Sequence, residues 1–320
     1  MKYRFIADIP THCYQKGVAG NMLFYTQKDR LLYLTIYSTQ AKKYHIKTLA
    51  LNLMFNHTHS LIKANDLASL TLFNATTQQM YAREQNAYLQ KEGKWFMKTF
   101  GWAQKNKAKD VRSCYCYIQN NAVEKHLYSQ ALDDRWNFSA YYKKSQPFSF
   151  PIRSRNSTLA FRKATHLIDQ LHHKGDFLTL HQLDYFTKTL SEEDTNRLTD
   201  YIISLYCPID FHEAENYYDS YEAMIEACKI TAGSEYSLKE LPEHYSDKPF
   251  LALLKEIDKQ GIPASRKAFF KYNKEHTLRL ACQLLQKTNA PVSMISRFLH
   301  FPIHTAPDKK ELAFLSTPLI

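Results

Sequence analysis

A pair of histidines with the spacing of metal ligands stands out in the sequence. His57 and His59 are separated by one residue in the run LNLMFNHTHSLI. The apolar residues on both sides predict a buried strand, in which alternate side chains point to the same face. Both imidazoles should therefore face one point, where neutral ring nitrogens can bind a divalent cation.

A second element, predicted to be a helix over residues 110–127, offers a nucleophile. Tyr117 and Asn121 are four residues apart, so they share one face of a helix and can present a phenol and an amide oxygen to the same site. Tyr115 is the rival nucleophile. A helix turns about 100° per residue, which places Tyr115 nearly opposite Tyr117, and Gln119 stands where Tyr115 would need an asparagine.

These two segments resemble a known family. LALNLMFNHTHSLIKANDLASL and VRSCYCYIQNNAVEK are similar to the motifs of single-tyrosine HUH transposases, especially the REP-associated tyrosine transposases. Their pattern is a strand ending in Met-Pro-Asn-His-hydrophobe-His, then a helix with Tyr-x-x-x-Asn-Pro-Val. The likeness covers about residues 1–127, including THCYQKGVAGNMLFYTQKDR. Three positions depart from it: Phe55 and Ala122 stand where the family has proline, and Thr58 replaces the hydrophobic residue between the histidines.

The resemblance implies a specific chemistry. Tyr117 would attack a DNA phosphodiester, remain linked to the 5′ phosphate and release a 3′-hydroxyl, which fits the lack of a nucleotide-binding glycine motif. His57, His59 and Asn121 would hold Mg²⁺ or Mn²⁺, although two imidazoles would suit Zn²⁺ equally. The implied partner is single-stranded DNA with hairpin structure. Relatives act as monomers or as homodimers that exchange tyrosine helices, and the sequence leaves both open.

Basic residues alternate with aromatic ones between the two motifs. Lysine and arginine neutralise phosphates, and aromatic rings can stack on unpaired bases. Alternatively, Trp95 and the phenylalanines form the buried side of a strand. The candidate DNA-binding residues are Lys91, Lys94, Lys98, Trp102, Lys105, Lys107, Lys109 and Arg112.

The periodicity of the first half predicts a fold that can position these groups. Apolar spacing indicates strands at 3–14, 46–55, 58–63 and 95–102, with helices at 27–43, 66–89 and 110–127. The order β-α-β-β-α-β, followed by a helix, is that of a ferredoxin-like antiparallel sheet. We therefore expect an α+β nuclease domain over residues 1–140.

The second half reads as helical. A basic, proline-containing stretch at 141–158 predicts a linker, and an all-α domain should occupy 159–320. Its predicted helices cover 159–173, 179–190, 191–206, 213–230, 249–259, 263–272, 275–288 and 291–299. The last two resemble the start of a helix-turn-helix, or form an ordinary helical hairpin, since Pro302 and Pro307 interrupt the place of a recognition helix.

Composition limits the remaining function classes. The 320 residues carry a formal net charge of +11, which favours a polyanionic partner such as nucleic acid. No apolar run has membrane-spanning length and the first residues lack a signal-peptide core, so we expect a cytoplasmic protein. The resemblance implies that it is bacterial and nucleoid-associated. The six cysteines show no paired CxxC spacing and are expected to be reduced thiols.

Two classes of function remain. The leading hypothesis is a metal-dependent nuclease and strand transferase, either of a mobile element or of a domesticated relative. The alternative is a non-catalytic nucleic-acid-binding or regulatory protein derived from the same fold. Retention of His57, His59, Tyr117 and Asn121 together favours the enzyme, because decay would be expected to remove one of them first.

Overall fold

The computed structural model describes residues 4–151, 157–230, 246–260 and 269–303. The strands are β1 (Thr11–Lys16), β2 (Lys47–Leu53), β3 (His57–Lys63) and β4 (Gly101–Gln104). The helices are α1 (Gln27–Lys43), α2 (Leu67–Leu89), α3 (Ala108–Glu124), α4 (Leu159–Lys174), α5 (Leu180–Thr189), α6 (Glu192–Tyr206), α7 (Phe211–Glu215), α8 (Tyr221–Ile230), α9 (Lys248–Lys259), α10 (Lys274–Lys287) and α11 (Val292–Leu299).

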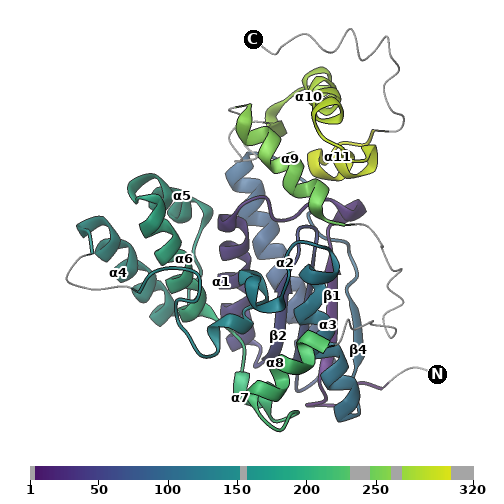
Figure 1. Ribbon diagram of the computed structural model, residues 1–320, viewed down its shortest axis with the longest axis vertical. Coiled ribbons are helices and arrows are strands. Elements are labelled where there is room, and N and C mark those ends of the chain that lie inside the picture. The colour runs from purple at the N-terminus through teal and green to yellow at the C-terminus, as the bar shows by residue number, and fades with distance from the viewer. Residues whose placement is uncertain (1–3, 152–156, 231–245, 261–268, 304–320) are drawn as a thin grey trace.

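The four strands form one antiparallel sheet in the order β2-β3-β1-β4. Helices α1 and α2 share an apolar core with one face of the sheet, whereas α3 packs on the opposite face, against β2 and β3 (Figure 1). This is the predicted ferredoxin-like order of an α+β fold, with a helical region after it. Because β3 and α3 are in contact, the histidine strand and the tyrosine helix lie together.

Local capping sets where the first two helices begin. The Thr26 hydroxyl accepts a hydrogen bond from the Asp29 backbone N–H, and the Asp29 carboxylate accepts one from the Thr26 backbone N–H, which forms a capping box at the start of α1. At α2, the Asp66 carboxylate accepts from the Ser69 backbone N–H at 2.7 Å. The structure confirms the predicted bounds of α1 and places α2 within one residue of its prediction.

Two predicted strands differ from the structure. The first, expected at 3–14, is β1 at Thr11–Lys16, because Asp8 adopts a positive φ of 58° and its backbone N–H bonds to Ala64 in a turn. The last, expected at 95–102, is β4 at Gly101–Gln104. Trp95 is buried, and its indole N–H donates to Asn86 of α2, so its aromatic segment fills the core beside the sheet.

The helices of the second half form three groups on different sides of the sheet unit (Figure 1). Helices α4–α6 share a core with α1, α7 and α8 pack beside β2 and α3, and α9–α11 cover the turn between β2 and β3. Each group thus completes an apolar core that begins in the sheet unit. The predicted division into independent domains at 141–158 is not tested by these contacts and stays a prediction.

Two details of the helical half were predicted incompletely. The helix expected at 213–230 is two helices, α7 and α8, separated by residues 216–220. The hairpin of α10 and α11 is present, but most of the helix expected at 263–272 lies outside the described residues, as does Pro307. Within the described ranges, no helix is both long and apolar enough to cross a membrane.

Candidate functional site

The histidine pair and the candidate nucleophile meet between β3 and α3. His57 and His59 lie on the face of β3 that α3 covers, with ring centres 4.9 Å apart. The ring of Tyr117 stands edge-on to His59, with a centroid distance of 5.3 Å. The three side chains are at most 9% exposed, so they form one enclosed cluster.

Asn121 lies one helical turn beyond Tyr117 and is 3% exposed. Its side-chain oxygen is buried and accepts no hydrogen bond from any described residue. A buried amide oxygen without a donor is rare in folded proteins and is chemically suited to a cation. The Asn121 oxygen therefore has lone pairs that are available to a cation.

The hydrogen bonds of Asn56 assign the protonation of His57. The Asn56 amide nitrogen donates to the Gly20 carbonyl at 3.2 Å, which leaves its oxygen as the acceptor for His57 Nδ1 at 2.6 Å. His57 Nδ1 must then carry the proton. In the neutral ring the lone pair then lies on Nε2, the arrangement in which a histidine can bind a metal while its other nitrogen is held in place.

His12 of β1 is a site residue that the sequence did not reveal. It is fully buried, and its Nε2 lies 2.9 Å from His59 Nδ1. If His59 presents its Nε2 lone pair to a cation, the proton of this bond must sit on His59 Nδ1 and His12 must accept it. Burial, and then the nearby charges of His57, His12 and Lys125, hold the pKa of His59 well below its usual range, which keeps the ring neutral.

Strand β1 and the end of α3 add further groups to the cluster. Tyr14 pairs with His59 across the sheet and lies 4.9 Å from its ring, while Lys16 pairs with His57. Lys125 follows Asn121 by one turn. The i, i+4, i+8 spacing of Tyr117, Asn121 and Lys125 is visible in the sequence and could have indicated the lysine, whereas the β1 residues depend on strand register.

Tyr115 lies on another side of α3. It is 2% exposed and its ring packs edge-on to Tyr218 at 5.9 Å, beneath α8. Burial raises the pKa of its phenol far above the usual range, which disfavours the phenolate. The geometry therefore separates the two tyrosines as the helix spacing predicted.

The side chains of the cluster determine which kind of cation could bind there. No three side chains among the described histidines, cysteines, aspartates and glutamates form a metal-binding group. A cation here would depend on the imidazoles of His57 and His59 and on the Asn121 oxygen. This mixed set suits a divalent ion that accepts both nitrogen and oxygen ligands.

Five of the eight candidate DNA-binding residues are exposed. They lie before β4 and around the start of α3, whereas Tyr117 and Asn121 lie farther along that helix. The exposed residues are Lys94, Lys98, Lys107, Lys109 and Arg112.

The other three candidates are at least partly buried. Lys105 is 5% exposed, and the Lys91 ammonium lies 4.0 Å from the ring centre of Phe270. Trp102 packs edge-on against Phe5 at 5.7 Å. These three side chains contact other parts of the protein, whereas the five exposed ones face solvent. DNA binding stays a prediction for all eight.

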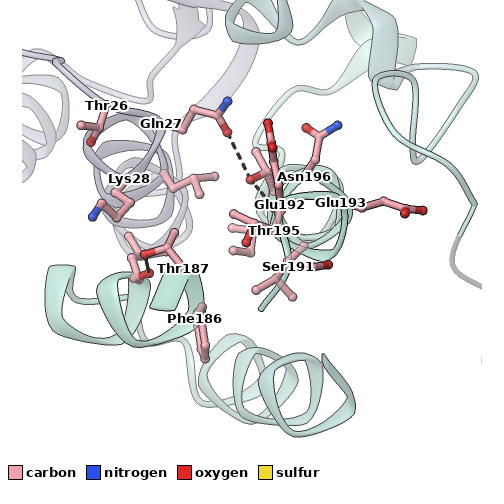
Figure 2. Close-up of a pocket in the computed structure, with 15 residues that line it drawn as sticks. Thr26, Gln27, Lys28, Phe186, Thr187, Ser191, Glu192, Glu193, Thr195 and Asn196 are labelled. Carbon is pink, nitrogen blue, oxygen red and sulfur yellow. Dashed lines mark hydrogen bonds between the residues drawn. The ribbon is translucent and has the colours of Figure 1, made fainter. Parts of the chain in front are cut away.

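A large cavity of about 880 Å³ lies away from this cluster, where α5 and α6 meet α1. Figure 2 shows threonine, glutamine and glutamate side chains lining it. Thr199 donates a hydrogen bond to Gln27 at 3.4 Å. None of the residues predicted for chemistry lines this cavity.

Comparison with known proteins gives one structural likeness. No protein-family model and no curated protein matches the chain. A solved structure described as a REP-associated tyrosine transposase bound to a REP hairpin is similar over 43% of this chain and 81% of that chain, with 13% sequence identity and a TM-score of 0.37.

Proposed function

We propose that this protein cleaves and rejoins single-stranded DNA through a covalent 5′-phosphotyrosine intermediate on Tyr117, with Mg²⁺ or Mn²⁺ as cofactor. One observation carries the proposal. The rings of His57 and His59 lie 4.9 Å apart and that of Tyr117 lies 5.3 Å from His59, while Asn121 is buried one turn farther along the same helix as Tyr117. Unrelated core residues have no reason to combine a phenol, two imidazoles and an amide oxygen without a donor.

In the proposed reaction Tyr117 is the nucleophile and nearby positive charge stabilises the phosphate. The Tyr117 oxygen attacks phosphorus, the bond from phosphorus to the 3′-oxygen breaks, and the departing oxygen takes a proton from solvent while the phenol proton is lost to solvent. Attack by another 3′-hydroxyl reverses these bond changes and releases Tyr117. A bound divalent cation would neutralise the non-bridging phosphate oxygens. Lys16 and Lys125 place further positive charge beside the histidines.

The alternative is a non-catalytic nucleic-acid-binding or regulatory protein, and burial of the cluster favours it. The four side chains are at most 9% exposed, so a DNA phosphate reaches Tyr117 only if the covering side chains move. The two functions differ in one outcome, because only the enzyme becomes covalently attached to DNA.

The test uses the full chain and labelled single-stranded oligonucleotides that reproduce hairpins in the flanking DNA. With Mg²⁺ or Mn²⁺, the wild type should give an adduct that survives denaturing electrophoresis, whereas Tyr117→Phe should bind DNA without one. Tyr115→Phe is the matched control, because it removes one phenol oxygen from the same helix, and it should keep the adduct. DNA binding by the wild type with no adduct at any hairpin would favour the non-catalytic function.

A further inference from the structure

A second cavity, of about 290 Å³, is lined by residues that are close in sequence to those of the candidate site. It opens between the start of α1, the end of β2, the end of α3 and α9, and Phe55 and Ala122 line it. Phe55 is two residues from His57, and Ala122 follows Asn121 directly. A DNA strand whose phosphate reaches Tyr117 would therefore pass close to this cavity.

Two of the three departures from the resembled motif meet in this cavity. Phe55 and Ala122 both replace proline, and both line its wall. Phe55 also packs against Phe250 of α9 at 5.8 Å, which joins the cavity to the helical half. The cavity is thus built partly from residues that distinguish this chain from the motif it resembles.

Arg30 is the cationic side chain in the cavity wall. Its guanidinium carbon lies 4.9 Å from the ring centre of Phe55 and 5.4 Å from that of Trp136, and its Nε donates to the Leu53 carbonyl at 3.3 Å. The two terminal nitrogens make no hydrogen bond to any described residue. The rings and Leu53 hold the side chain in place, so these nitrogens are donors that a ligand can use.

The charge of the cavity is balanced. Asp134 is 3% exposed and also lines the wall, with its carboxylate accepting from the Trp136 backbone N–H at 2.9 Å and from Asn52 at 3.3 Å. Its charge offsets that of Arg30. Most of the remaining lining is apolar or aromatic, as at Leu53 and Phe55, so the cavity suits a flat, neutral ligand with acceptors on one edge better than a free anion.

We propose that this cavity binds one unpaired guanine of the DNA strand that the Tyr117 site engages, with Arg30 donating to guanine O6 and N7. The inference rests on the proposed function for its ligand. Guanine is the base that presents two adjacent acceptors on one edge, whereas adenine pairs an acceptor with a donor there. Apolar contacts with Trp136 and Phe55 would cover the ring of the base.

The test measures binding without chemistry. Tyr117→Phe protein in EDTA is titrated into labelled short thymidine oligonucleotides that carry a single guanine, adenine, cytosine or 7-deazaguanine at each position in turn. At one position, guanine should bind about tenfold more tightly than adenine, and 7-deazaguanine should lose most of that gain because it lacks N7. Since no cleavage is measured, this result is independent of whether the wild type forms an adduct.

Two further variants locate the preference. Arg30→Lys keeps the charge but loses the paired donors, and Leu251→Trp fills the cavity from its partly exposed rim on α9 without touching Arg30. Both should bind all four oligonucleotides alike, with affinity for plain thymidine oligonucleotide unchanged. Arg83→Lys, at an exposed position on α2, should behave like the parent. The proposal is overturned if no position prefers guanine, or if the preference survives in Leu251→Trp or in folded Arg30→Lys protein.

Discussion

Replacing His12 with phenylalanine tests how the metal ligands are positioned. The change keeps a ring next to Tyr117 but removes the nitrogen that lies 2.9 Å from His59 Nδ1 and would accept its proton in the metal-binding tautomer. Both histidines are buried, so the variant would lose a hydrogen bond inside the core. We expect this to destabilise the fold by about 1–3 kcal/mol, the usual cost of removing one partner of a buried hydrogen bond.

The functional effect should be separable from that loss of stability. Without its acceptor, His59 can move its proton to Nε2 and no longer present a lone pair, and losing such a supporting hydrogen bond costs about 10- to 100-fold in metal affinity. Titration with Mn²⁺ by calorimetry would measure the change. His12→Gln, which can place an amide oxygen near the former Nε2, should restore most of the affinity, and His173→Phe at an exposed position should have no effect. Unchanged Mn²⁺ affinity in folded His12→Phe protein would refute this role.

Three further predictions concern the metal ligands, the buried Asp134 and the packing of the helical half. His57→Ala and His59→Ala should each abolish Mg²⁺- or Mn²⁺-dependent adduct formation, and Asn121→Ala should be milder because water can replace an amide oxygen; full activity in excess EDTA would exclude a metal. Burial raises the pKa of Asp134 to about 6, so the native state holds its proton more tightly and the free energy of unfolding should fall by about 2 kcal/mol as pH rises from about 4 to about 6. Urea unfolding at several pH values should show that this fall is missing in Asp134→Asn. The same pH dependence in the wild type and the variant would contradict the raised pKa of Asp134. Ile168→Ala on α4 should destabilise the sheet unit by about 2–5 kcal/mol in one melting transition, because this fully buried residue belongs to the core that includes α1; a separate early transition would instead reveal an independent helical domain.

Local signals made much of the sheet unit predictable. Apolar spacing predicted α1 at its observed bounds, where a capping box within four residues fixes its start, and the alternation in β3 placed His57 and His59 on one face. His12 could not be found in this way, because its contact with His59 depends on the register between β1 and β3. Register is set by packing across the whole sheet, so it cannot be predicted from the sequence of a short segment.

The aromatic segment before β4 was misjudged for a related reason. Its alternating pattern indicated a strand, but Trp95 is held by Asn86 of α2 and fills the core beside the sheet. The cavity around Arg30 was equally hidden, since Phe55, Trp136 and Leu251 come from distant parts of the chain. Long-range packing of the helical half against the sheet unit is what the sequence pattern alone does not specify.

Mapping the attached residue by mass spectrometry tests the central claim most directly. After incubation with hairpin DNA and Mn²⁺, nuclease trimming and trypsin digestion should release the peptide of residues 113–125, which contains both Tyr115 and Tyr117. We predict that fragmentation of this peptide places the nucleotide on Tyr117. A nucleotide on Tyr115, on Tyr14 or on any other residue of a catalytically active sample would contradict the assignment of the nucleophile.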